Sequence, residues 1–88
     1  MNRFRIEKSF AVEPGTFVFA GTTIEGGVRS GMRFKVPEAG HMWDFAIRSV
    51  EFIRKEGRSD LVGLTVDNGT PGYLPGLGIG WVAELYDE

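Results

Sequence analysis

The chain has 88 residues, no cysteine and a formal net charge of -2, with a pI of about 5.4. A chain of this length forms one domain, and the lack of cysteine excludes disulfides, thiolate nucleophiles and zinc held by cysteine. Its acidic balance argues against strong non-specific binding of nucleic acid, since domains that bind phosphate backbones usually have a pI above about 9. We therefore expect a single domain over residues 1–88.

Charge is distributed unevenly along the chain. Residues 1–58 hold all 10 Lys and Arg and 7 Asp and Glu, a net charge of +3, whereas residues 59–88 hold 5 acidic residues and no base, a net charge of -5. Folding can mix the two halves on one surface, so the asymmetry alone defines no binding face. No apolar stretch reaches the roughly 18 residues of a membrane helix, and no signal-peptide core is present. We expect a cytoplasmic protein with no membrane partner.

The first predicted strand covers residues 4–12. Phe4, Ile6, Phe10 and Val12 share one parity, which predicts a strand with one buried face. Residues 13–15 then end the strand, because proline fixes φ and glycine accepts turn conformations.

Two further strands are predicted before residue 40. Residues 16–24 are β-branched and aromatic on both parities, which favours a central strand. Residues 25–27 (E-G-G) predict a tight turn of a hairpin, and the alternation of residues 32–36 predicts a strand with Arg33 and Lys35 outward.

Residues 43–55 form the longest apolar run and fit two periods. As a helix, Trp43, Ile47 and Val50 fall at three- and four-residue spacing, with Gly57 as a C-terminal stop. This spacing alone does not decide between helix and strand.

The same run also fits a strand with an irregularity. Phe45 and Ile47 lie on one parity and Val50 and Phe52 on the other, so the apolar face switches across residues 48–49, as a β-bulge allows. The aromatic and β-branched composition favours this strand.

Residues 61–66 and 80–85 predict two short final strands, with a polar turn at residues 56–60. The chain thus contains about six strands punctuated by glycine and proline, and small all-β chains protect their edges by closing into a barrel. We expect an all-β fold, a small closed six-stranded β-barrel, with a Gly/Pro-rich loop at residues 67–80.

Five short motifs follow one another along the chain. They are V-F-A-G from Val18, I-E-G-G-V from Ile24, S-G-M from Ser30, the run from Ile47 to Lys55, and L-V-G-L from Leu61. Their order resembles the second domain of translational GTPases such as elongation factor Tu, which is a small six-stranded β-barrel. The resemblance covers about residues 4–85 and favours the strand interpretation of residues 43–55.

The resemblance also implies a site. In that family the strand similar to residues 50–55 helps to hold the 3′-terminal adenosine of aminoacyl-tRNA, with an acid and an arginine placed as Glu51 and Arg54 are here. It implies RNA or the ribosome as a partner, with a basic side formed by Arg48, Arg54, Lys55 and Arg58. The simpler interpretation is that Glu51 and Arg54 are solvated charges or one exposed ion pair, contributing under about 1 kcal/mol. No G-x-x-x-x-G-K-[ST] motif is present, so we expect no GTP on this chain.

Large apolar residues accompany the glycines and prolines of the last loop. Such a loop either packs on the barrel or exposes a contact patch for another protein or a second copy of the chain. The candidate binding residues here are Tyr73, Leu74, Leu77 and Trp81.

No catalytic residue, metal site or cofactor is expected. His41 is the only histidine and has no partner that the sequence can name as required for a general base, while Asp67 and Asn68 are typical of a turn. No nucleophile motif or metal-ligand cluster is visible, so an enzyme is disfavoured.

Two hypotheses about function follow. The first is a non-enzymatic stand-alone β-barrel binding module that contacts a protein partner or itself through residues 71–81. The alternative is a translation-associated RNA or ribosome binder.

Overall fold

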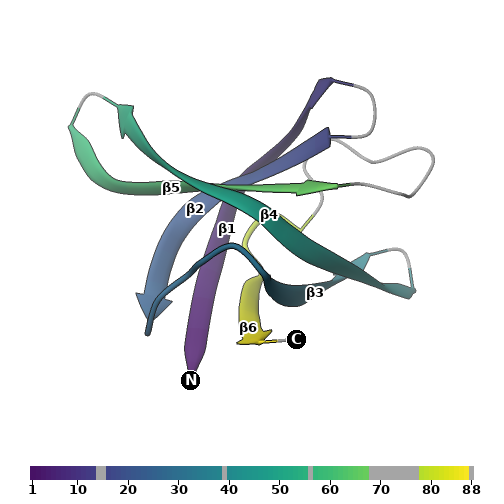
Figure 1. Cartoon of the computed structure of the whole chain (residues 1–88). Helices are drawn as coiled ribbons and strands as arrows, with labels where there is room; N and C mark the ends of the chain where they lie inside the picture. The colour runs from purple at the N-terminus through teal and green to yellow at the C-terminus, as the bar shows by residue number, and fades with distance from the viewer. Residues whose placement is uncertain (14–15, 39, 56, 68–77, 88) are drawn as a thin grey trace.

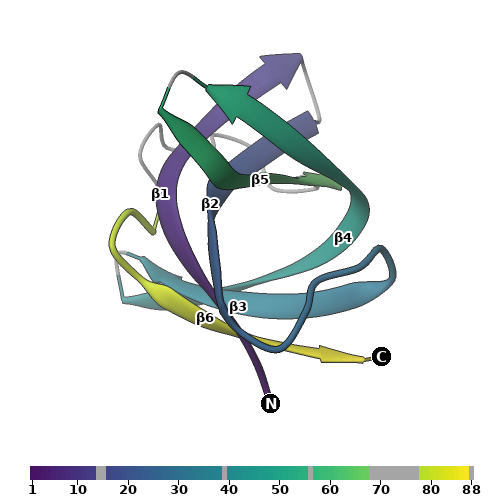
Figure 2. The same ribbon diagram turned by 90° about the vertical axis from the view of Figure 1, so that its left-hand side faces the viewer.

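The computed structural model describes residues 1–13, 16–38, 40–55, 57–67 and 78–87. All six strands pair antiparallel, in the order β1-β2-β5-β4-β3-β6, and β6 returns to β1 to close a barrel (Figures 1 and 2). The strands are β1 (Asn2–Glu13), β2 (Thr16–Glu25), β3 (Met32–Glu38), β4 (His41–Lys55), β5 (Arg58–Asp67) and β6 (Val82–Asp87). The predicted all-β class and closed six-stranded barrel are confirmed. Within these ranges the structure has no helix long and apolar enough to cross a membrane.

The last four strands form a Greek key. β3, β4 and β5 follow one another as hairpin neighbours, and β6 returns to lie beside β3 (Figure 2). Figure 1 shows the β4–β5 hairpin reaching to one side and the β1–β2 and β3–β4 hairpins reaching to the other. The predicted loop at residues 67–80 lies mostly outside the described residues; β5 ends at Asp67 and residues 78–80 form a turn before β6.

Phenylalanine fills much of the core, as the aromatic composition of β2 and β4 requires. The ring centroid of Phe19 lies 4.9 Å from that of Phe45 and 5.1 Å from that of Phe17, both edge to face. A third ring, that of Phe34, lies 5.3 Å away. Such pairs add about 0.5–1.5 kcal/mol each beyond the burial of their surface. The rest of the buried cluster is Phe4, Ile6, Met32, Val36, Ile47, Val62, Leu64, Val66, Ala83 and Leu85.

β2 is the central strand that its composition predicts. It pairs with β1 on one edge and with β5 on the other, and it is buried on both faces over most of its length. The close approach of β1 explains Gly21, because a Cβ at this position would lie 1.8 Å from the carbonyl oxygen of Arg5.

The face switch predicted for β4 is confirmed. Its pairing with β5 shifts register between Ile47 and Ser49, as a bulge does. Ile47 is buried before the shift and Val50 packs against the core after it. Phe52 does not enter the core, however: it is 82% exposed because the β4–β5 hairpin extends beyond the barrel (Figure 1).

The prediction for the first strand is wrong in its second half. The pairing of β1 with β2 shifts register between Ile6 and Lys8. Phe4 and Ile6 are buried as expected, but the shift turns Phe10 and Val12 to the outer face, where they are 42% and 56% exposed. A bulge reverses the side-chain parity of everything that follows it.

The tight hairpin turn predicted at residues 25–27 is also wrong. β2 pairs with β1 and β5, whereas β3 pairs with β4 and β6, so residues 26–31 cross between strands that are not neighbours. Gly26 has a φ of 70°, which suits glycine, but the conformation serves this crossing connection.

Candidate binding groove

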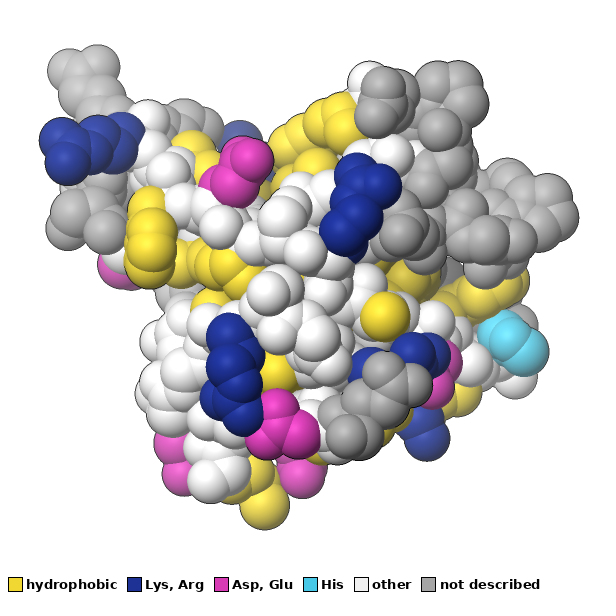
Figure 3. Space-filling view, in the orientation of Figure 1, with side chains coloured by type: hydrophobic (Ala, Val, Ile, Leu, Met, Phe, Trp, Pro, Cys, Tyr) yellow, Lys and Arg dark blue, Asp and Glu magenta, His cyan; other side chains and the backbone are white. Residues whose placement is uncertain are grey.

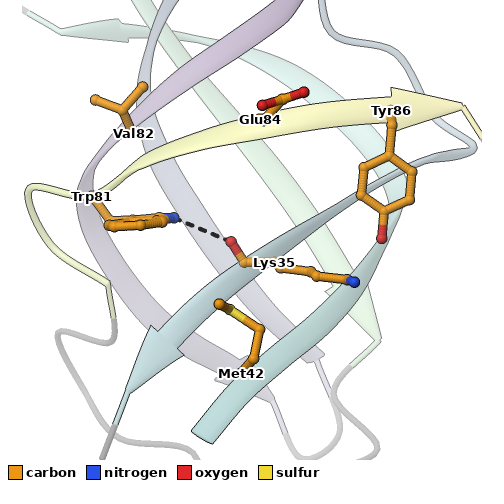
Figure 4. Close-up of a pocket in the computed structure, with 6 residues that line it drawn as sticks. All are labelled: Lys35, Met42, Trp81, Val82, Glu84 and Tyr86. Carbon is orange, nitrogen blue, oxygen red and sulfur yellow. Dashed lines mark hydrogen bonds between the residues drawn. The ribbon is translucent and has the colours of Figure 1, made fainter. Parts of the chain in front are cut away.

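The barrel wall is incompletely paired between β3 and β6. β3 pairs with β4 over six residues, and β6 pairs with β1 over four. Between β3 and β6 the register has only two pairs, Met32 with Asp87 and Arg33 with Tyr86. Beyond Arg33 the two facing strand edges diverge, as Figure 4 shows. We call this stretch, residues 34–37 of β3 and 82–85 of β6, the seam.

The Trp81 indole lies between β3 and β6, where the two strands have diverged. Its Nε1 donates a hydrogen bond to the backbone carbonyl of Lys35, at 3.1 Å (Figure 4). The backbone of Trp81 is held from β1, because the amide of Ile6 donates to its carbonyl at 3.0 Å, and from the preceding turn, because its own amide donates to the Gly78 carbonyl at 2.9 Å. A side chain thus takes the place of a strand-to-strand hydrogen bond.

That turn closes the end of the barrel by a tight contact. Gly78 is buried with a φ of 73°, and a Cβ on it would lie 2.6 Å from Val36 and 3.2 Å from Ile6. Only glycine fits this space and this conformation. The contact fixes where residue 81 enters the wall.

A shallow groove of about 330 Å³ runs along the outer side of the seam. Its lining is apolar and aromatic at the floor, with one charge of each sign. The lining residues are Lys35, Met42, Trp81, Val82, Glu84 and Tyr86 (Figure 4). Trp81 is 42% exposed and Met42 about half exposed, so this floor is accessible to a partner. Aromatic residues with a polar edge favour binding surfaces, since they bury much area with little loss of conformational freedom.

Two ion pairs lie at the end of the groove where β3 pairs with β6. Arg33 Nε lies 3.3 Å from Asp44 Oδ1, and the Tyr86 hydroxyl donates to the same oxygen at 3.5 Å. Arg29 donates to Asp87 Oδ2 at 2.6 Å on the exposed surface. Neither of the groove's own charged residues forms a salt bridge with another described residue.

The predicted site residues fall in different places. Trp81 lies in the groove. Glu51 and Arg54 are exposed on the second half of β4, and residues three apart on an extended strand point to opposite faces. The structure does not bring these two side chains together. Tyr73, Leu74 and Leu77 lie outside the described residues.

The predicted basic side lies on the β4–β5 hairpin. Arg48 and Arg54 are exposed, and Lys55 pairs in register with Arg58 near the turn. On the face seen in Figure 3, basic, acidic and hydrophobic side chains are interspersed, so this face carries no continuous patch of one charge.

His41 packs against its neighbour. Its ring lies 4.5 Å from that of Trp43, edge to face, at the start of β4. The Trp43 Nε1 is buried and has no hydrogen-bond acceptor in the described part of the chain. Across the described ranges, no group of three or more His, Cys, Asp or Glu residues could hold a metal ion.

The sequence alone does not predict most of the residues that line the groove. The alternation of β3 predicted that Lys35 points outward, and Val82, Glu84 and Tyr86 alternate in the same way in β6. This alternation shows which side chains share the outer face of each strand. It does not show that a groove lies between the two strands. The groove depends on how far two strands pair, which neither strand encodes alone.

Comparisons with known protein families, with characterised proteins and with solved structures found no match.

Proposed function

We propose that this protein is a non-enzymatic binding module that holds a partner protein against the groove between β3 and β6. One observation carries the proposal: an accessible aromatic and apolar groove lies where the facing edges of β3 and β6 have no strand partner among the described residues. Strand edges and aromatic floors are both features that protein segments bind. The partner implied is therefore a polypeptide.

The shape of the groove supports a macromolecular partner over a small substrate. Small-molecule sites usually enclose most of their ligand, whereas this groove is shallow and open along the surface. The polar side chains of its described lining are one lysine, one glutamate and one tyrosine besides the Trp81 indole, and they include no paired nucleophile and base. These features support binding without chemistry.

A selected ligand with two matched variants tests the proposal. Peptides from a random display library would be selected on the wild-type protein and their affinity measured by calorimetry. Val82→Asp places a charge in the groove and should weaken binding about tenfold or more. Val12→Asp places the same charge on the outer face of β1 and should leave affinity unchanged. Equal loss in both variants, or no selectable ligand, would contradict the proposal.

A second copy of the chain is the other polypeptide that could occupy the groove. Light scattering at rising concentration distinguishes the two cases. A mass that increases with concentration for the wild type and stays monomeric for Val82→Asp would make the protein its own partner. A monomer at every concentration would leave only a foreign polypeptide.

The translation-associated RNA or ribosome binder is the second candidate. The resemblance to the second domain of translational GTPases supports it, as does the exposure of Arg48 and Arg54 on β4. RNA binding measured by fluorescence anisotropy should weaken with salt, and Arg54→Ala should reduce the salt slope by about one. Arg29→Ala is the matched control because Arg29 already pairs with Asp87. No binding at low salt would remove this candidate.

A further inference from the structure

We propose that the partner contributes an extended segment that adds to β3 as an antiparallel strand at Lys35, in place of the Trp81 indole. This inference rests on the proposed function and specifies how the groove binds and what kind of segment it takes.

The backbone of the seam is complementary to such a segment. β4 pairs with β3 as far as Glu38, whereas β6 pairs with it only at Met32 and Arg33. The described residues supply no further strand partner on this edge. The Lys35 carbonyl accepts a hydrogen bond from an indole, and an indole between two backbones keeps them further apart than the roughly 4.8 Å of a paired ladder. An added strand would replace this substitute with a backbone bond.

The indole can leave because little holds it. Trp81 is 42% exposed, and one neutral hydrogen bond ties its ring to β3. The exchange conserves that bond: the segment's backbone amide donates to the Lys35 carbonyl, and the released Nε1 donates to water. The displaced ring still offers its apolar face to the bound segment, so Trp81 acts both as a gate and as a contact.

The seam also specifies the chemistry of the segment. The residue directly opposite Lys35 would share its outer face, with Cβ atoms about 4.5–5.5 Å apart, and the lysine has no salt bridge among the described residues. An acidic residue fits there. Two positions towards the N-terminus of the segment, opposite Pro37 on the same outer face, an apolar residue would reach Met42, which pairs with Pro37, and the displaced indole. In the other direction β6 already pairs with Arg33.

The residue between these two would point into the barrel. Phe34 and Val36 are fully buried on the inner wall of β3, and Ala83 is fully buried on that of β6. Close-packed interiors accept little added volume, so this residue is small. The segment is therefore extended, with the order apolar, small, acidic from its N-terminus to its C-terminus.

Synthetic peptides test the mode of binding. The parent would be a capped seven-residue peptide with Leu-Ala-Glu at its centre, and its affinity would be measured by calorimetry on the full chain. We expect binding that falls about tenfold or more when the glutamate amide, which donates to Lys35, is N-methylated. N-methylation of the preceding alanine, whose amide points away from β3, should weaken binding far less. A Leu-Ala-Lys peptide should also bind weakly.

A matched pair of tryptophan variants tests the gate. Trp81→Phe keeps an aromatic ring but removes the donor to Lys35, so the parent peptide should bind about fivefold more tightly, as expected from the loss of one neutral hydrogen bond. Trp43→Phe changes the other tryptophan, which lies on the inner side of β4, and should leave affinity within about twofold. Circular dichroism would establish that both variants remain folded.

The outcomes separate this inference from the proposed function. If the parent binds and N-methylation at either position has the same small effect, or Trp81→Phe binds no more tightly, strand addition is wrong while the groove remains the binding site. If Leu-Ala-Glu peptides fail to bind although other library peptides do, the inferred chemistry of the segment is wrong. If no peptide of any kind binds, the proposed function fails.

Discussion

Two parts of the same barrel wall are built differently. The wall formed by β1, β2, β5 and β4 is hydrogen-bonded along long registers and lies over the phenylalanine cluster. The wall between β3 and β6 has two register pairs and then opens around an indole. A closed barrel protects its edges by pairing them, so the seam is a place where this protection is incomplete.

Under the proposed function, the difference separates the part of the barrel that stabilises the fold from the part that binds a partner. Burial and pairing along the first wall stabilise the fold, and their loss should unfold the chain. The seam contributes fewer backbone pairs, and local opening takes place where such pairs are few. A binding surface can therefore change there at little cost to the rest of the barrel. The following substitutions test this division.

The largest effect is expected from Phe19→Ala. Phe19 is fully buried and its ring contacts three other aromatic rings, so truncation should lower the free energy of unfolding by about 3–5 kcal/mol. The total free energy of unfolding of a small domain is only about 5–15 kcal/mol. Urea denaturation followed by circular dichroism would measure the change. Phe10→Ala, the same substitution on the outer face, should cost about 1 kcal/mol, and equal costs would refute the assigned faces.

Gly21→Ala should be the next most damaging change. The added methyl group would overlap the Arg5 carbonyl where β1 and β2 approach, and overpacking of this kind costs about 1–3 kcal/mol or more. Gly27→Ala is its control, because a Cβ there meets no described atom within 4 Å. Thermal unfolding of the two variants should differ by several degrees. Similar midpoints would mean that the strands are not this close.

Val82→Asp should lower stability only slightly. Val82 is partly exposed on the outer face of β6, so the substitution should cost about 1 kcal/mol or less through its strand propensity. The same variant should lose affinity for the ligand of the groove. Val82→Asp should therefore affect binding more than stability, whereas Gly21→Ala should affect stability. A large loss of stability in urea would show that the seam supports the fold as strongly as the first wall does.

Arg29→Ala should have the smallest effect. Arg29 and Asp87 form an exposed ion pair next to the short β3–β6 register, and such pairs contribute about 0–1 kcal/mol. The difference from wild type in urea should shrink further at high salt. A cost well above 1 kcal/mol would mean that this pair holds β6 in place, and the seam would then be less free to open than we describe.

The sequence predicts the strands and the barrel well because these depend on local signals. Glycine and proline mark the strand ends, and the switch of apolar parity between Ile47 and Val50 is visible within β4 itself. The bulge near Glu7 is not visible in this way, because it depends on how β1 meets Ala20 and Gly21 of its partner. Phe10 is therefore as hydrophobic as a core residue but lies on the outer face of β1.

The candidate site is predicted less completely for the same reason. Trp81 stood out as a large apolar residue next to glycines, which is a local feature. Lys35 and Tyr86 did not, since a groove arises only when strands far apart in sequence fail to pair. A binding role for Glu51 and Arg54 follows from the resemblance alone, and it stays a prediction.

The position at which a ligand binds tests the role of the seam most directly. Amide chemical shifts of the ¹⁵N-labelled protein would be followed while the Leu-Ala-Glu peptide is added. We predict that the largest shifts occur in residues 34–37 of β3 and 81–86 of β6, with the Trp81 indole signal among them. If the largest shifts occur instead on the β4–β5 hairpin, around residues 48–54, binding at the seam is contradicted.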